Sequence, residues 1–185
     1  SPNICVTDIR LLRVDASTPD GRPAALRVYG PNGGLRWVRE LVTGEPCSDV
    51  PVVGDVDGDG FMEVFVDVGD RLFALRHDGS PVPGNWPVAL EVRKLGKVLA
   101  DLDGDGRLEL VGHAQAPSDV GGGQNPLLVV YDGGGEVLRR WNLRDASVAA
   151  ELPRLFPAVG NLDEDAELEI VALDGGHDLV VFDFN

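Results

Sequence analysis

An internal repeat limits the folds open to this chain more than any other feature. Three segments align without gaps and read VGDVDGDGFMEV (53–64), LADLDGDGRLEL (99–110) and VGNLDEDAELEI (159–170). Each begins with a short apolar run, continues into an acidic loop, and ends with apolar residues at every second position, such as Met62 and Val64. A period of two is typical of a half-buried β-strand. The repeat therefore predicts a strand, an acidic loop and a second strand in each unit.

A further apolar run after each loop predicts a third strand. These runs are 72–78, 127–132 and 179–183, each with an aromatic residue or His followed by Asp near its end. A glycine-containing turn then leads, in the first two cases, to a segment with Trp86 or Trp141, and residues 26–41 match only this second half. Four antiparallel strands that repeat every ~40–60 residues are typical of a β-propeller blade. We therefore expect an all-β chain made of four-stranded antiparallel blades.

The predicted domain organisation is a single β-propeller domain or fragment over residues 1–185. Its blades would span about 1–45, 46–92, 93–150 and 151–185, with the first and last incomplete. This amounts to about three and a half blades, whereas a closed ring needs about four or more. Two readings stay open. Either the chain is a segment of a larger propeller, whose exposed blade edges would associate with a second copy or a partner, or residues 4–14 complete the last blade and close a small ring.

The repeats also differ in length. Asp55 and Asp101 are 46 residues apart, while Asp101 and Asn161 are 60 apart. We expect the additional residues in two connections, near 113–126 and 145–152, that emerge at the end of the sheets opposite to the acidic loops. Loops of this kind often carry ligand-binding residues, although an insertion is more often a solvated loop.

The acidic loops carry the chemistry of the sequence. Residues 55–63 (the first loop) and 101–109 (the second loop) both follow the pattern D-x-D-x-D-G-x-x-E. Carboxylates at alternate positions of a tight loop converge on one point, and Ca²⁺ takes about six to eight oxygen ligands. Glycine at position six permits a left-handed turn, and the backbone carbonyl of position seven adds a ligand. The predicted ligands are Asp55, Asp57, Asp59, Phe61 and Glu63, and Asp101, Asp103, Asp105, Arg107 and Glu109.

This pattern is not an EF-hand. An EF-hand has its closing Glu at position 12, on a helix, whereas here the closing Glu is at position nine, on a predicted strand. The alternative is an exposed acidic turn that binds no ion. Four acids within nine residues, in two copies, would repel one another without a cation, which favours a metal site.

Residues 161–169 (the third loop) depart from the pattern. Asn161 replaces the first Asp, and Ala166 replaces the turn glycine. A left-handed Ala costs about 1 kcal/mol, so we expect weaker calcium binding here, or none. The extra acids Glu164 and Glu167 would compensate in part. The predicted ligands of this degenerate site are Asn161, Asp163, Asp165, Glu167 and Glu169.

With these loops, their flanking strands and the Asp-Gly turns in register, residues 26–185 resemble FG-GAP (VCBS-like) repeats. Such repeats build the propeller of integrin α subunits and occur in many secreted bacterial proteins. Similar blades appear in some fungal lectins and in rhamnogalacturonan lyases. The resemblance implies structural calcium at the residues named above, an extracellular location, secreted or on the cell surface, and a role in adhesion or ligand binding. It does not identify the ligand, because the fold carries many functions.

Charge and composition narrow the classes of partner. The chain has 31 acidic and 16 basic residues, a formal charge of −15, which disfavours nucleic acid and anionic membranes. The sequence contains no run of 18 apolar residues, which is about the length that a membrane-spanning helix needs. Cys5 and Cys47 are either a disulfide or two buried thiols. We therefore expect an unidentified protein or glycan as the ligand.

The remaining candidate residues favour a binding module over an enzyme. Trp37, Trp86 and Trp141 recur at nearly one position of the fourth strand, which favours packing between blades over sugar stacking. His77 aligns with Tyr29, Tyr131 and Phe182 and is also expected to pack. No set of Ser, His and Asp or of Cys and His is proposed as catalytic. The prediction is a non-catalytic, calcium-stabilised interaction module, and the alternative is the propeller of a lectin or polysaccharide lyase.

Overall fold

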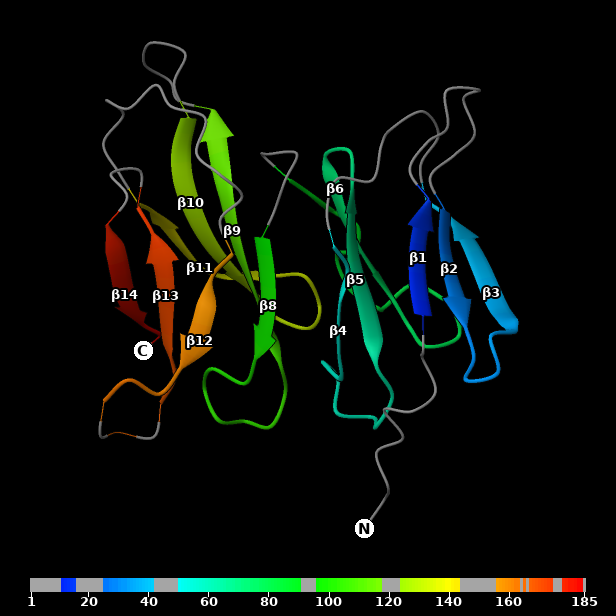
Figure 1. Cartoon of the computed structure of the whole chain (residues 1–185). Coiled ribbons are helices and arrows are strands. Elements are labelled where there is room, and N and C mark those ends of the chain that lie inside the picture. The colour runs from blue at the N-terminus through cyan, green and yellow to red at the C-terminus, as the bar shows by residue number, and fades with distance from the viewer. Residues whose placement is uncertain are drawn as a thin grey trace. The chain divides into compact units, whose positions relative to one another are not determined.

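The computed structural model describes residues 11–15, 25–41, 50–90, 96–117, 124–143, 156–163, 165, 167–174 and 178–184. In these residues the regular elements are β-strands (Figure 1). The chain divides into two compact units, Ser1–Arg93 and Lys94–Asn185, and each unit contains two antiparallel sheets. The described residues contain no helix that is long and apolar enough to cross a membrane.

The first unit holds a three-stranded sheet with the order β1-β2-β3 and a four-stranded sheet with the order β4-β5-β6-β7. Neighbouring strands in both sheets follow one another in the sequence and run antiparallel. Their bounds are β1 Leu11–Asp15, β2 Ala25–Tyr29, β3 Leu35–Glu40, β4 Val52–Gly54, β5 Glu63–Val68, β6 Arg71–Leu75 and β7 Val88–Ala89.

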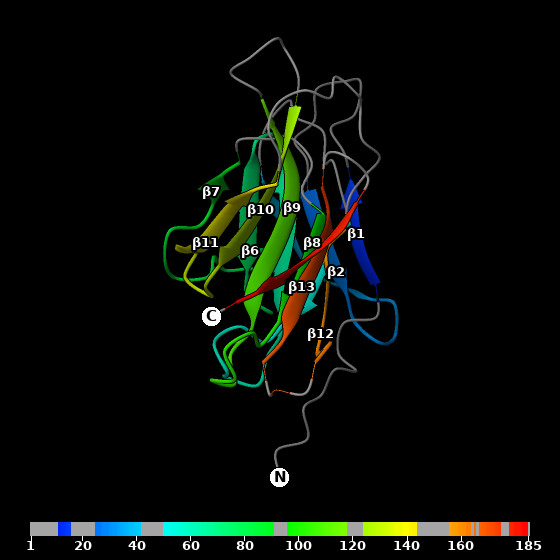
Figure 2. The same ribbon diagram turned by 90° about the vertical axis from the view of Figure 1, so that its left-hand side faces the viewer.

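The second unit holds a four-stranded sheet with the order β8-β9-β10-β11, followed by a three-stranded sheet with the order β12-β13-β14. In Figure 2, which views the whole chain from the side of this unit, β8 and β12 end at the same end of their sheets. The first strands of the two sheets, β8 and β12, are neighbours. The bounds are β8 Gly96–Ala100, β9 Glu109–Pro117, β10 Gln124–Tyr131, β11 Val137–Asn142, β12 Ala158–Gly160, β13 Glu169–Leu173 and β14 Leu179–Asp183.

The predicted all-β class with four-stranded, blade-like antiparallel sheets is confirmed. One alternative needs correction. Strand β1 pairs with β2 from Leu11↔Tyr29 to Asp15↔Ala25, so residues 11–14 belong to the first sheet and do not complete the last one. Residues 4–10, the rest of the segment considered for ring closure, lie outside the described residues. So do Cys5 and Cys47.

Among the described residues, each unit buries an apolar cluster to which two sheets contribute. In the first unit, Leu26 of β2 packs with Val64, Val66 and Leu75 of the neighbouring sheet. Strand β5 is buried along its whole length because both of its faces are covered. The cluster of the second unit consists of Leu102, Val111, Leu128, Val130, Ile170, Ala172 and Phe184.

The longer middle repeat is partly explained by longer strands. Strands β9 and β10 have 9 and 8 residues, whereas the equivalent β5 and β6 have 6 and 5. Continuous pairing from Tyr131↔Leu110 to Gln124↔Pro117 forms this extension. The additional residues were predicted to form a loop, and part of them extend the hairpin instead. Residues 118–123 and 144–155 lie outside the described residues.

The tight turns after β2, β6 and β10 share one hydrogen-bond pattern. In each, the N–H of the first residue donates to the carbonyl of the fifth, as Arg76 does to Ser80 and Asp132 does to Glu136. The equivalent residues of the first turn are Gly30 and Gly34. Arg76 therefore corresponds to Asp132, and His77 does not correspond to Tyr131 as predicted. The alignment was wrong by two residues because it superimposed two Asp-Gly pairs that occupy different positions of the turn.

Candidate metal centres

The three acidic loops join the first and second strands of three sheets. The first loop connects β4 to β5, the second connects β8 to β9, and the third connects β12 to β13. In each hairpin the last residue of the first strand pairs with the closing glutamate, as in Gly54↔Glu63 and Ala100↔Glu109. The pairing Gly160↔Glu169 repeats this in the third sheet. The start of the second strand thus fixes the closing glutamate beside the loop.

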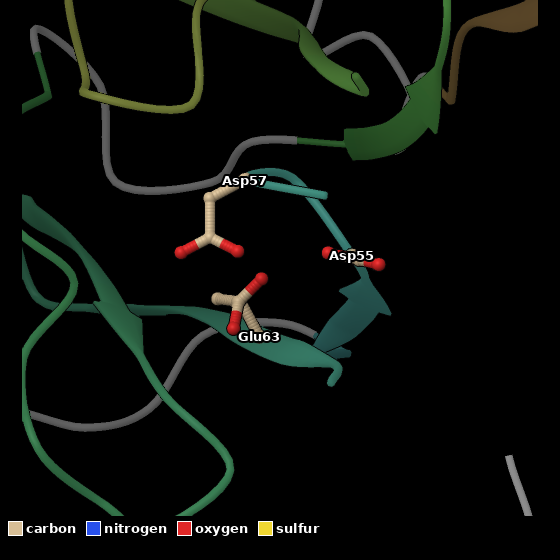
Figure 3. A group of neighbouring side chains, drawn as sticks. All are labelled: Asp55, Asp57 and Glu63. Atoms are coloured by element: carbon tan, nitrogen blue, oxygen red, sulfur yellow. The ribbon is translucent and has the colours of Figure 1, made fainter. Parts of the chain in front are cut away.

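Each loop brings three carboxylates together, with one oxygen of each within 4.8 Å of the others. Figure 3 shows the first group, in which the carboxylates of Asp57 and Glu63 face one another and Asp55 lies beside the end of β4. Such groups of oxygen atoms can hold a metal ion. The three groups are Asp55, Asp57 and Glu63; Asp101, Asp103 and Glu109; and Asp163, Asp165 and Glu169.

The closing glutamates hold the loops by one oxygen and leave the other available. Glu63 Oε2 accepts the backbone N–H of Val56 at 3.1 Å, and Glu109 Oε2 accepts that of Leu102 at 2.8 Å. Glu63 has 0% exposure, yet its Oε1 accepts no hydrogen bond. Asp101 Oδ1 in the second loop is also buried without a partner. A buried carboxylate oxygen without a donor is costly, and a cation would satisfy it, so the donor set fits a hard metal ion.

The electrostatics of the two complete loops agree with this. Burial raises the pKa of Glu63 to about 7, and burial likewise raises the pKa of Glu109. The hydrogen bond from Val56 or Leu102 lowers each pKa, while the charges of three loop aspartates raise it further. The loops therefore concentrate negative charge where burial disfavours it. A bound cation would reverse this balance and favour the ionised carboxylates.

Backbone geometry at position six agrees with the sequence prediction. Gly60 and Gly106 have φ values of 88° and 87°, in the left-handed region. Their N–H groups donate to the first aspartate of the loop, Asp55 Oδ2 at 2.9 Å and Asp101 Oδ2 at 3.0 Å. Nothing lies within 4 Å of a Cβ built on either glycine, so the φ angle alone requires glycine there.

Not every predicted ligand joins a group. Asp59 and Asp105 are exposed, and their Oδ1 atoms accept the N–H groups of Phe61 and Arg107 at 2.8 Å. They help to shape the loop and lie outside the groups of three. Phe61 and Arg107 occupy position seven as predicted, and the ligand role of their carbonyl oxygens stays a prediction.

The third loop keeps the same framework with different donors. Glu169 Oε2 accepts the N–H of Leu162, and Asp163 Oδ1 accepts that of Asp165 at 2.9 Å, as in the other two loops. Asn161 donates its Nδ2 to the carbonyl of Asp165. Glu167 is exposed, donates its N–H to Asp165 Oδ1, and is outside the group. Glu164 and Ala166 lie outside the described residues.

A basic residue that the sequence analysis did not identify contacts the first loop. Arg76, directly after β6, places its Nη2 3.2 Å from Asp57 Oδ2, and both side chains are about one-third exposed. The two residues are 19 positions apart. No local motif signals the contact, because it depends on the register of β5 against β6.

Two of the three tryptophans join neighbouring sheets. Trp37 of β3 donates Nε1–H to the carbonyl of His77 at 2.8 Å, and a Cβ on Gly79 would lie 3.0 Å from its ring. Trp141 of β11 packs on Phe182 of β14, with ring centroids 5.4 Å apart. Both contacts agree with the packing role expected from the sequence.

Trp86 differs from the other two. It precedes β7 instead of lying on it, because Pro87 has no N–H for the strand ladder, and it packs edge-on against Phe65 of its own sheet. His77 and His113 have different surroundings. His77 stacks on Phe61 with centroids 4.2 Å apart. His113 is buried, its pKa is lowered to about 4 by burial, and neither ring nitrogen has a hydrogen-bond partner. His177 lies outside the described residues.

Comparisons with known proteins give one structural likeness. No protein-family model matches the chain, and no curated protein matches it. A crystal structure of the biofilm matrix protein Bap1 of V. cholerae is similar over 96% of this chain, with a TM-score of 0.44 and 16% sequence identity. The chain spans 34% of the length of that protein. Likeness at this level does not assign a function.

Proposed function

We propose that this chain is a set of calcium-binding β-propeller blades of the FG-GAP type. The observation that carries the proposal is the buried Glu63, whose Oε1 has no hydrogen-bond partner and lies within a group of three carboxylates. A group of three carboxylates recurs in the second loop, where Asp101 Oδ1 is the buried oxygen without a partner, and a more exposed group recurs in the third loop. Because the side-chain donors are all carboxylate oxygens, a hard cation is the matching ligand.

Calcium fits these loops better than magnesium. Magnesium requires near-ideal octahedral geometry and releases its waters reluctantly, whereas calcium accepts irregular sets of about six to eight oxygens. The loop carboxylates, a backbone carbonyl and water would complete such a set. The ion would be structural, because it would tie the end of the first strand to the start of the second. Its positive charge would also offset the repulsion among the carboxylates of Asp55, Asp57 and Glu63.

We further propose a non-catalytic interaction module of a secreted or cell-surface protein. Extracellular calcium modules bind with dissociation constants of about 10⁻⁴–10⁻³ M, and exposed acidic loops suit that range. The carbohydrate-active alternative receives no support from the tryptophans in the described residues, because all three take part in packing. We expect the ligand of the module to be a protein or a glycan. A glycan array together with a pectin-type lyase assay tests this part, and reproducible turnover would overturn it.

Thermal unfolding with and without calcium tests the metal proposal. Calcium at about 100 times its dissociation constant stabilises the folded protein by about 2.7 kcal/mol for each site. Filling both complete loops should therefore raise the melting temperature by about 10 °C or more, relative to the same protein in chelator. Asp70→Asn is the matched control, since Asp70 is an exposed acid in the turn between β5 and β6, away from the loop. An identical melting curve in chelator and calcium would contradict the proposal.

A further inference from the structure

Arg76 distinguishes the first loop from the second. Its Nη2 lies 3.2 Å from Asp57 Oδ2, within salt-bridge distance of a carboxylate in the first acidic group. The other oxygen of Asp57 accepts the N–H of Asp59 at 3.2 Å. Both oxygens of this predicted ligand therefore have partners within the protein. In the second loop, Asp103 accepts the N–H of Asp105 at 3.1 Å, and no basic side chain of the described residues pairs with it.

The position of Arg76 carries a different charge in the other sheets. Strand pairing puts Leu75 opposite Val64, so the next residue, Arg76, falls opposite Glu63. The same step beyond Tyr131↔Leu110 puts Asp132 opposite Glu109. In the third sheet the pair is Glu169↔Asp183. The residue across from the closing glutamate is therefore a cation beside the first loop and an acid beside the other two.

Neither acid acts as a substitute for Arg76. Asp132 Oδ1 accepts the N–H of Glu136 at 2.7 Å within its own turn, and Asp183 is exposed. Arg107 is in the second loop, but its side chain is exposed and contacts no carboxylate of that loop among the described residues. Solvent and salt screen such an exposed charge.

A guanidinium beside a ligand carboxylate has two effects on cation binding. It repels a second cation, and it occupies a lone-pair direction of Asp57 that the ion would otherwise use. In the metal-free protein the same contact offsets part of the repulsion among the loop carboxylates. Both effects favour the metal-free state of the first loop over its bound state.

We propose that the two complete loops are calcium sites of unequal affinity, and that Arg76 makes the first loop the weaker one while stabilising it when no ion is bound. This inference rests on the proposed function. As calcium falls, the first loop empties before the second. The chain would therefore respond to calcium in two steps, and Arg76 is the residue that separates them.

Calorimetric titration of the whole chain with calcium tests the inference. The Asp103→Asn variant isolates the first loop, and the Asp57→Asn variant isolates the second. We expect the first loop to bind about tenfold more weakly than the second. Adding Arg76→Gln to the Asp103→Asn variant should tighten calcium binding by about tenfold. Adding Arg76→Gln to the Asp57→Asn variant should leave the remaining affinity unchanged.

Two further measurements separate charge from folding. Arg71→Gln is the matched control, because Arg71 is an exposed arginine at the other end of β6, and it should change neither affinity. In chelator, Arg76→Gln should lower the melting temperature by a few degrees. In the calcium titration, Arg76→Lys keeps the positive charge, so the first loop should bind calcium nearly as weakly as it does in the unmodified protein.

The outcomes are distinct. If Arg76→Gln weakens calcium binding at the first loop or leaves it unchanged, Arg76 does not oppose the ion and the inference is wrong. If the first loop is the tighter site in the otherwise unchanged protein, the inference is wrong as well. Absence of calcium binding by every variant and by the unmodified chain would overturn the proposed function, and the inference with it.

Discussion

The two complete loops and the third loop share a framework and differ in their donors. In all three, the closing glutamate accepts a backbone N–H seven residues earlier. The carboxylate at position three accepts the N–H of position five in each loop as well. These hydrogen bonds persist in the third loop, where Asn161 replaces the first aspartate. Loop shape therefore does not depend on the full set of ligands.

This comparison separates the hydrogen bonds that shape all three loops from the residues that only the complete loops have. The closing glutamate and the third-position aspartate shape every loop through the backbone. The first aspartate and the glycine at position six are what the third loop lacks, so they are the residues expected to determine affinity. The carboxylates of Asp163, Asp165 and Glu169 still lie together, but two of the three are exposed. Exposed carboxylates repel one another less and gain less from a cation.

Substitution of the closing glutamates should cause the largest loss of stability. At a calcium concentration that fills both complete loops, Glu63→Gln should destabilise the protein by about 3 kcal/mol and Glu109→Gln by about 4 kcal/mol, because each abolishes one bound ion and the second site is the tighter one. Glu169→Gln should cost less than about 1 kcal/mol, since the amide oxygen can still accept the N–H of Leu162. Chemical denaturation in calcium measures all three.

Repeating the measurement in chelator provides the control. Without the ion, Glu63→Gln should be no less stable than the unmodified protein, because it removes a buried charge that burial disfavours. Equal losses for Glu63→Gln and Glu169→Gln in calcium would mean that the third loop holds an ion as firmly as the first. That result would remove the distinction between the loops.

Restoring the third loop is the complementary change. The double variant Asn161→Asp with Ala166→Gly recreates the complete pattern and should add a calcium site that stabilises the protein by about 1–3 kcal/mol in calcium. Calorimetry would register one more ion per chain than the unmodified protein binds tightly. Each single variant is a control and should recover part of the affinity. No gain in binding from the double variant would show that position and exposure, instead of these two residues, weaken the site.

A smaller effect is expected at position six. Gly106→Ala should cost about 1–2 kcal/mol, because the added Cβ meets nothing within 4 Å and the left-handed φ of 87° is the sole penalty. Gly160→Ala is the matched control, since Gly160 also has open space and is not at positive φ. Thermal unfolding in calcium compares the two variants. Equal stability of both would indicate that the turn glycine is not what the third loop lacks.

Local patterns predicted the fold and most of the candidate site. The alternation around Met62 and Val64 and the D-x-D-x-D-G spacing act within one hairpin, so the sequence specifies both directly. Asp59 and Asp105 satisfy backbone N–H groups and lie outside the carboxylate groups, so their roles as ligands stay predictions. A carboxylate at position five can close the turn and also belong to the group, as Asp165 does in the third loop, so spacing alone does not define the ligand set.

Features that depend on strand register were not predictable. Arg76 reaches Asp57 only because β6 pairs with β5 in a register that puts it opposite Glu63. The sequence alignment equated His77 with Tyr131, whose structural equivalent is Leu75, and it was therefore wrong by two residues. The extension of β9 and β10 was missed for the same reason, since a longer hairpin and a longer loop have the same number of residues. Register comes from pairing across the sheet, which a single repeat does not encode.

The number of calcium ions bound per chain, measured by native mass spectrometry across a calcium series, tests most directly whether the carboxylate groups are calcium sites. We expect one ion for each complete loop, with a third appearing only at much higher calcium. The variant Asp57→Asn with Asp103→Asn should lose both tightly bound ions, while Asp70→Asn should keep them. No bound calcium, or an ion count that the double variant leaves unchanged, would contradict the conclusion that these carboxylate groups are calcium sites.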